Sequence, residues 1–75
     1  MISDKQCKMA RAATGMGVRD LAASAGVSVD TVSRLERGEE LLPRTVDAIR
    51  AALEKAGVEF IETDRGEGVI RLRRN

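Results

Sequence analysis

The sequence contains no histidine and a single cysteine, Cys7, and these two shortages exclude several classes of site. One cysteine cannot form an intrachain disulfide, and without histidine the chain has no Cys/His ligand set for zinc. Catalysis by a histidine base beside serine or cysteine is excluded for the same reason. We therefore expect no metal, no cofactor and no enzymatic activity, and we interpret the nearest carboxylates as surface or structural groups: Glu36, Glu39 and Glu40.

Long apolar runs are also lacking. No segment approaches the roughly 18 apolar residues that span a membrane. Residues 3–8 are mostly polar or charged, unlike the apolar core of an export signal. Since a lone thiol also fits a reducing compartment, we expect a cytoplasmic protein with no membrane partner.

The chain is short and nearly neutral, with 75 residues, 13 Lys+Arg and 12 Asp+Glu. A domain of this size buries only about 60% of its unfolded surface, and small domains often gain stability from disulfides, metals or self-association. With the first two excluded, self-association remains. The charge balance gives no support for a nucleic-acid partner, because the usual indication is a pI above about 9. Such a function has to be argued from the positions of individual residues.

Helix signals divide the first 57 residues into four segments. Ser3 and Gln6 have the spacing of a capping box before the first segment. Ser28 is placed to cap the third segment, and Pro43 suits the first position of the fourth. The predicted helices span residues 5–14, 18–25, 29–37 and 43–56, and each is followed by a glycine that can end it: Gly15, Gly26, Gly38 and Gly57.

The hydrophobic period changes after Gly57. Residues 58–62 are β-branched or aromatic in the main, residues 69–73 alternate apolar and basic side chains, and a polar segment with two glycines separates them. This pattern predicts a β-hairpin. We expect Phe60, Ile70 and Leu72 to cover the fourth helix, with Val69, Arg71 and Arg73 on the opposite face.

The two short helices joined by Gly26, Val27 and Ser28 are the centre of the functional argument. Val32 and Leu35 follow the joint at spacings that point into one core. This arrangement favours a helix-turn-helix, whose second helix enters the major groove of DNA and touches base edges with its N-terminal residues. Spacing alone also fits a helical hairpin in an ordinary bundle, so both interpretations stay open at this point.

A wider pattern runs through residues 3–56. It includes the segment GVSVDTVSRLERGE (residues 26–39) together with Arg11, Gly15, Asp20-Leu21-Ala22 and Ile49. These positions resemble the Cro/repressor (Xre-type) helix-turn-helix family of phage and bacterial regulators. The resemblance implies a mainly α, lambda-repressor-like four-helix domain (residues 1–57), which residues 58–75 extend by a two-stranded β-hairpin. It also implies a sequence-specific regulator of transcription, a repressor of bacterial or phage origin, that binds double-stranded DNA and is associated with the nucleoid in the cytoplasm.

The resemblance implies base contacts at the start of the third helix, from Ser28, Val29, Asp30 and Thr31, with Arg34 one turn further on. Arg34 can bind guanine O6 and N7 through two hydrogen bonds, and Asp30 can accept one from cytosine N4. An equal alternative for Asp30 is that it complements the helix dipole and does not touch DNA.

Contacts with the DNA backbone are implied for Arg37 and Arg44. Many relatives carry a glutamine at the start of the second helix, where this chain has Val18. A phosphate contact there is therefore expected from backbone N–H groups or from Arg19.

Three further residues receive structural roles. Arg11 and Glu36 match a buried ion pair of similar repressors and are not expected to contact DNA. Cys7 matches an apolar core position, where an inert thiol is favoured over a redox switch.

For the role of the hairpin the sequence supports two hypotheses equally. A two-stranded hairpin is marginal by itself. It can support a homodimer through Phe60, Ile70 and Leu72, which would present two recognition helices to a palindromic site. Alternatively it only extends the core, and its exposed edge is kept soluble by arginines: Arg71, Arg73 and Arg74. DNA-backbone contact by these arginines ranks third.

Two alternative functions also remain. One is an antitoxin that represses its own operon and holds a toxin through the hairpin. The other is a protein-interaction module that has lost DNA binding, which the near-neutral charge, Val18 and the acidic pair Glu39-Glu40 favour.

Overall fold

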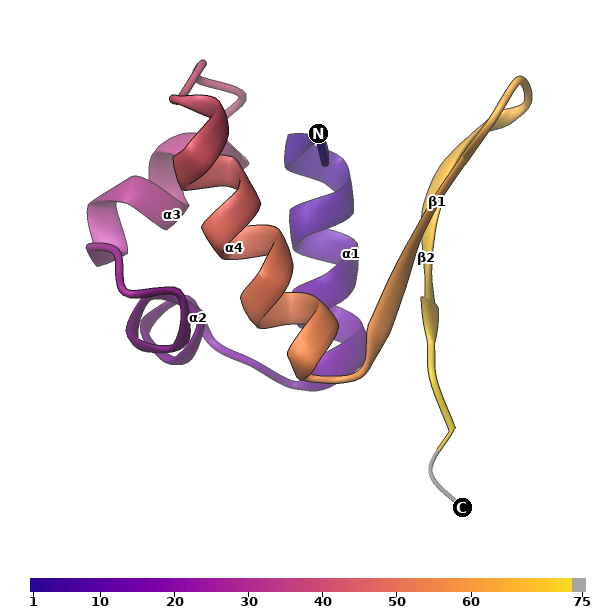
Figure 1. Ribbon diagram of the computed structural model, residues 1–75, viewed down its shortest axis with the longest axis horizontal. Helices are drawn as coiled ribbons and strands as arrows, with labels where there is room; N and C mark the ends of the chain where they lie inside the picture. Colours follow the sequence, from indigo (N-terminus) through magenta and orange to yellow (C-terminus); the bar gives the residue numbers. More distant parts are fainter. Residues whose placement is uncertain (74–75) are drawn as a thin grey trace.

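In the computed structural model, which describes residues 1–73, four helices are followed by an antiparallel hairpin (Figure 1). Arg74, one of the tail arginines considered above, lies outside the described residues. The elements are α1 (Asp4–Thr14), α2 (Val18–Ala25), α3 (Val29–Glu36), α4 (Pro43–Lys55), β1 (Val58–Thr63) and β2 (Gly66–Arg71). The predicted fold class, four helices with a helix-turn-helix and a C-terminal hairpin, is confirmed.

The helix ends follow from local chemistry. The Ser3 hydroxyl accepts a hydrogen bond from the Gln6 N–H, and the Gln6 side chain accepts one from the Ser3 N–H, so the capping box of α1 is complete. Gly15 ends α1 with φ 74°, in the left-handed region that suits glycine. The third helix is one residue shorter than predicted, because Arg37 forms its C-cap.

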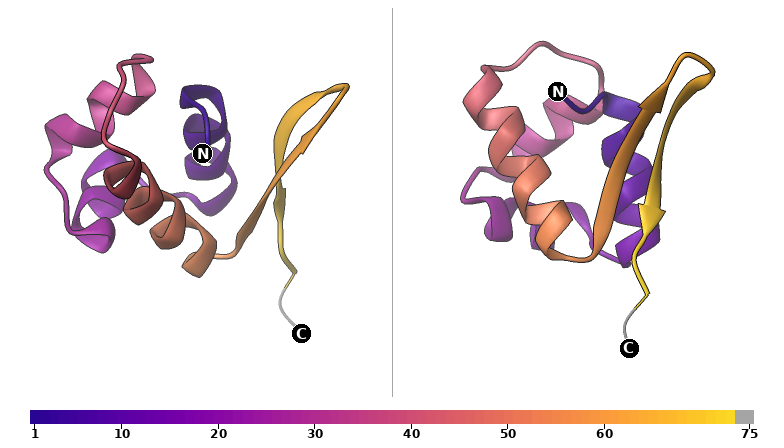
Figure 2. Two further views of the ribbon diagram at one scale, coloured as in Figure 1. Left: turned by 45° about the horizontal axis from the view of Figure 1, so that its top comes forward. Right: turned by 45° about the vertical axis from the view of Figure 1, so that its right-hand side comes forward.

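One core joins all four helices to the start of the hairpin. Its largest fully buried side chains are Leu21, Ile49, Leu53, Val32, Val58 and Cys7. Because Val58 belongs to β1, the hairpin begins inside the core and then runs across α1 and α4 (Figure 2). The sheet lies on one side of the molecule and α3 on the other, with α1 and α4 between them (Figure 1).

The hairpin differs from the prediction in its length and in which of its side chains face the core. Its turn contains only residues 64 and 65, and β2 begins at Gly66 where the sequence predicted Val69. Val69 stands opposite Phe60, and both are partly buried against the core. Ile70 and Leu72 are 45% and 46% exposed. The expectation that these two cover the fourth helix was wrong, because side chains alternate along a strand and the register with Phe60 turns Val69 inward.

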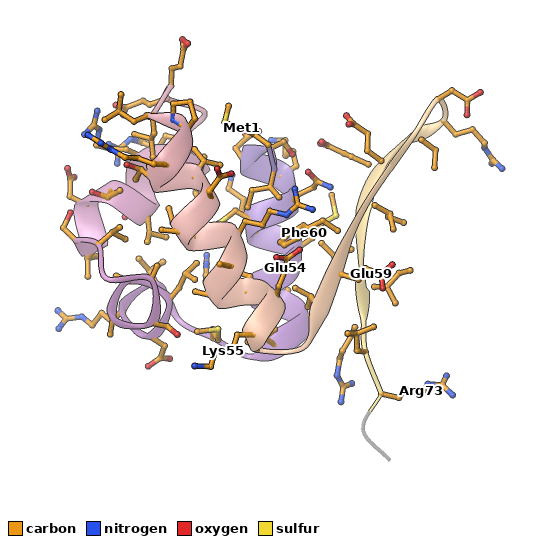
Figure 3. All side chains as sticks on the ribbon, viewed as in Figure 1. Met1, Glu54, Lys55, Glu59, Phe60 and Arg73 are labelled. Carbon is orange, nitrogen blue, oxygen red and sulfur yellow. The ribbon has the colours of Figure 1, made fainter. Side chains whose placement is uncertain are left out.

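Phe60 itself does cover α4. Its side chain projects from β1 toward this helix, whereas the neighbouring Glu59 points away from it (Figure 3). The Arg50 guanidinium lies 5.6 Å from the centre of the Phe60 ring, a cation–π distance. Arg50 also pairs with Glu54 one turn further along α4. Phe60 therefore already has contacts within the subunit, and its role in a dimer contact stays a prediction.

A buried glutamine fastens the hairpin to α1. Gln6 is 5% exposed, and its Nε2 donates to the Ile61 carbonyl (2.9 Å) and to the Gly68 carbonyl (3.1 Å). Ile61 and Gly68 face each other in the strand register. One amide therefore caps the first helix through its oxygen and holds both strands through its nitrogen.

Replacing Gln6 by methionine keeps the volume but removes the donor to both strands and the acceptor for the Ser3 N–H. We expect Gln6→Met to lower the free energy of unfolding by about 1–2 kcal/mol, because hydrogen-bond partners are lost beside buried carbonyls. Urea denaturation measures this. Lys8→Met, on the exposed side of the same helix, is the matched control and should stay within about 0.5 kcal/mol of the wild type. Equal effects of the two substitutions would contradict the role given to Gln6.

Candidate nucleic-acid interface

Helices α2 and α3 meet through a three-residue joint. Gly26 has φ 71°, and the joint is closed by hydrogen bonds from the Gly26 N–H to the Ala23 carbonyl (3.3 Å) and from the Val27 N–H to the Ala22 carbonyl (3.0 Å). Leu21 and Ala22 of α2 are buried, as are Val32 and Leu35 of α3. Since these side chains share one core, α3 is held by its inner face and its outer face is left to solvent. That face points away from α1 and the hairpin (Figure 1).

The start of α3 is open to solvent. Ser28, Val29 and Asp30 are exposed, and Val29 presents 43% of its surface. The Ser28 Oγ accepts from the Thr31 N–H (3.1 Å) and lies 2.8 Å from the Thr31 hydroxyl. Ser28 is thus the N-cap, and both hydroxyls already have one partner before any DNA is present.

The outer stripe of α3 contains Asp30, Ser33, Arg34 and Arg37, at spacings of three and four residues. Three of these residues were predicted from the sequence to contact DNA, and Ser33 was not. The signal was available, because Ser33 follows Asp30 by three residues and precedes Arg37 by four. Ser33 is half-buried, so it presents only part of a short polar side chain on this stripe.

An acidic residue holds the two arginines of this stripe together. Glu39 accepts from Arg34 Nε through one oxygen (3.1 Å) and from Arg37 Nε and Nη2 through the other (3.1 and 2.9 Å). Hydrogen bonds from Arg34 and then from Arg37 hold the pKa of the Glu39 carboxyl below its usual range. From the sequence, Glu39 was interpreted as a surface or structural carboxylate that, together with Glu40, favours a module that has lost DNA binding. Its position just after Gly38, which folds the chain back onto α3, is what brings it to both guanidinium groups.

The expected backbone contacts are distributed around this stripe. Arg19 on α2 and Arg44 in the first turn of α4 are both exposed. The Val18 side chain is partly buried against the core, so it is not available as a polar contact at the start of α2. The neighbouring Gly17 N–H already donates to Asp20 Oδ2 (3.0 Å). A phosphate arriving at this helix start would therefore compete with the Asp20 carboxylate.

Arg11 and Glu36 join α1 to the end of α3. Arg11 Nε donates to Glu36 Oε2 and Nη2 donates to Oε1, each at 2.7 Å, so the pair is bidentate. The side chains are 24% and 10% exposed. The hydrogen bond from Arg11 lowers the pKa of the Glu36 carboxyl and raises the pKa of Arg11.

Cys7 completes this cluster. The thiol is fully buried and donates to Glu36 Oε2 at 3.2 Å. Burial, and then the hydrogen bond to Glu36, raises the pKa of the thiol to about 12. Since a nucleophilic cysteine needs a lowered pKa and access to solvent, the geometry gives Cys7 a packing role.

Residues 1–73 include no group of three or more His, Cys, Asp or Glu side chains that could hold a metal ion. Within the same range, no helix has the length and apolar character needed to cross a membrane.

The tight glycine joint, the shared core of α2 and α3, and the open outer face of α3 define a helix-turn-helix protein. Comparison with protein families agrees: the model of the helix-turn-helix domain matches residues 6–65, which is more than half of the chain. The chain belongs to this family. No curated protein matches the sequence. Because helix-turn-helix domains place their second helix in the major groove, the family suggests a regulator that binds DNA.

A double-mutant cycle tests the Arg11–Glu36 pair. Arg11→Met should lower the free energy of unfolding by about 3 kcal/mol, because it leaves the Glu36 carboxylate buried without its partner. Glu36→Leu should cost a similar amount, and the double variant clearly less than the sum, since no charge is left unpaired. Urea denaturation at neutral pH measures all three variants.

The pH dependence of the free energy of unfolding, measured for the same variants, is the matched control. A depressed carboxyl pKa contributes stability above the unfolded value, near pH 4.3, and that contribution is lost as the pH falls through the folded pKa. Wild-type stability should therefore fall more steeply in acid than that of the double variant. Additive losses, or equal acid slopes, would show that the two residues do not act as a pair.

Proposed function

We propose that this chain is a sequence-specific transcriptional regulator of the Cro/repressor (Xre) type, a repressor that binds double-stranded DNA as a homodimer in the cytoplasm. The observation that carries the proposal is the outer face of α3. Its first residues are exposed, and Arg34 and Arg37 follow on the same side, where Glu39 contacts both. An exposed polar face is ordinary for a surface helix. What favours DNA is that α3 is the second helix of a helix-turn-helix, with its N-terminus open to solvent.

Each residue of this face has a separate proposed role. Asp30 and Arg34 offer hydrogen-bonding groups to base edges, and the exposed methyl groups of Val29 suit the methyl group of thymine. Ser28 caps the helix by accepting from the Thr31 N–H, and the hydroxyls of both residues lie where a further hydrogen bond reaches a base or a phosphate. Arg19, Arg37 and Arg44 surround them and supply charge to the DNA backbone, which positions the helix without selecting a sequence.

Arg34 is the main test of base recognition. If it binds a guanine through two hydrogen bonds, Arg34→Ala loses about 1–3 kcal/mol of discrimination at one base pair. Site selection from random DNA, followed by binding measurements on the selected site and its variants, detects this loss. Arg65→Ala, in the exposed turn of the hairpin, is the matched control and should leave the preferred sequence unchanged. An Arg34→Ala variant with unaltered preference would remove Arg34 from the base-reading set.

The contact of Glu39 with both arginines favours one second candidate, a helix-turn-helix domain that no longer binds DNA. An acidic residue that occupies Arg34 and Arg37 reduces the positive charge of the outer face. Under the DNA-binding proposal the same contact has another consequence: phosphate must displace Glu39 from Arg37, and Glu39 meanwhile orients Arg34.

Glu39→Gln separates these possibilities. Removal of the carboxylate should raise the affinity for non-specific DNA by about 2- to 5-fold at low salt, because both arginines become available to phosphate. Glu40→Gln changes the net charge equally, and Glu40 forms no ion pair within residues 1–73. Equal gains from the two variants would assign the effect to overall charge. Absence of DNA binding in the wild type and in both variants would favour the second candidate.

A further inference from the structure

Strand β2 has one edge that no element of residues 1–73 covers. The sheet contains two strands, and β1 is the one that lies toward α4 (Figure 2, right). The Leu72 N–H donates to the Gly57 carbonyl at 2.8 Å, which places this pair in hydrogen-bonded register. By alternation, the N–H and carbonyl groups of Gly66, Gly68 and Ile70 face β1. Those of Glu67, Val69 and Arg71 therefore face outward.

The Gln6 contact supports the same assignment independently. One Nε2 atom reaches both the Ile61 and the Gly68 carbonyl. This is possible only where both carbonyls point into the space between the strands, as in a hydrogen-bonded pair. The outward edge of β2 is thus an unpaired ladder centred on Val69, a feature that proteins normally cover or use.

The charges along the open edge of β2 are complementary to those of the same edge in a second copy of the chain. We infer that β2 pairs antiparallel with β2 of a second copy about a twofold axis at Val69, forming a four-stranded sheet. In this register Glu67 lies opposite Arg71 of the second copy, Arg71 lies opposite its Glu67, and the two Val69 residues face each other. Both charges of the strand thereby meet an opposite charge, which favours the pairing. The inference deepens the homodimer of the proposed function and rests on it.

The isolated hairpin has an unfavourable feature that this pairing offsets. Glu67 stands directly opposite Glu62 of β1, and like charges in that position destabilise a sheet. Neither glutamate forms an ion pair within residues 1–73. Arg71 of the second copy would approach Glu67 from the other side and supply the missing positive charge.

Apolar side chains on the outer face also gain contacts. Ile61 leans over Gly68, since a β-carbon at Gly68 would lie 3.7 Å from its side chain. The proposed register sets Ile70 of the second copy beside Gly68, next to Ile61. Ile61 and Ile70 are 38% and 45% exposed in the single subunit, so the contact would cover surface that is otherwise open.

Neighbouring registers fit the charges less well. A shift toward the turn places Arg71 opposite Arg65. A shift the other way pairs Glu67 with Arg73, which lies past the end of β2, and leaves Arg71 opposite Val69. In the Val69-centred register Arg65 meets Arg73 only beyond the paired strands, at the turn and past the end of β2. The pairing uses the side of the molecule remote from α3, so both recognition helices stay free (Figure 1).

Charge reversal and its rescue test the inference. Sedimentation of the full chain at tens to hundreds of micromolar should show a dimer for the wild type. Glu67→Arg should weaken it by about tenfold, because both cross-copy pairs become repulsive, and Arg71→Glu should do the same. The double variant Glu67→Arg/Arg71→Glu should restore it.

Glu67→Arg also removes the repulsion with Glu62, so the hairpin should remain folded. Asp47→Arg on α4 changes the net charge equally and should leave the dimer intact.

Hydrogen exchange of individual amides locates the contact. With rising protein concentration, protection should increase at Glu67, Val69 and Arg71, whereas Gly68 and Ile70 should change little because β1 already holds them. A wild type that stays monomeric with and without DNA overturns both the homodimer and this inference. A dimer indifferent to the charge variants, or without the alternating protection, overturns the β2 pairing alone. DNA binding is measured separately, so its failure would leave a charge-dependent dimer standing.

Discussion

The bidentate pair between Arg11 and Glu36 is the contact on which the recognition surface depends. It links the last turn of α1 to the last residue of α3, and the Cys7 thiol occupies the same carboxylate from within the core. Helix α3 has only two fully or nearly buried side chains, Val32 and Leu35, to hold it. Apolar contacts of that number permit some rotation of a short helix about its axis. A planar guanidinium that grips both carboxylate oxygens permits much less.

Such a pair is costly to bury, and apolar residues of similar size often give equal or greater stability. Its contribution here is to fix the orientation of α3. The outer stripe of α3 is useful only if it faces one way, and Glu36 is the last residue of that helix. The same logic applies at the surface, where Glu39 holds Arg34 and Arg37 in one orientation at a modest electrostatic gain.

The helical part of the fold was predictable because its signals are local. Ser3, Ser28 and Pro43 start helices, and glycines stop them, through the conformational preferences of single residues. Which side chains of the hairpin face the core was not predictable in this way. Ile70 and Val69 are both β-branched and apolar, and only the register with β1, which a short turn at residues 64 and 65 sets, decides which of them lies inside. Glu39 was missed as a partner of two arginines because its position depends on how the chain folds back after α3.

The glutamine that fastens the hairpin has a consequence for the order of folding. Its two contacts with the strands join residues 55 and 62 positions apart in a chain of 75, so they close nearly the whole polypeptide into a loop. Local contacts form early, and contacts of long sequence separation form after most of the entropy of the chain has been lost. The four helices can therefore assemble first through contacts of shorter sequence separation, and the hairpin docks onto the first helix as the closing step.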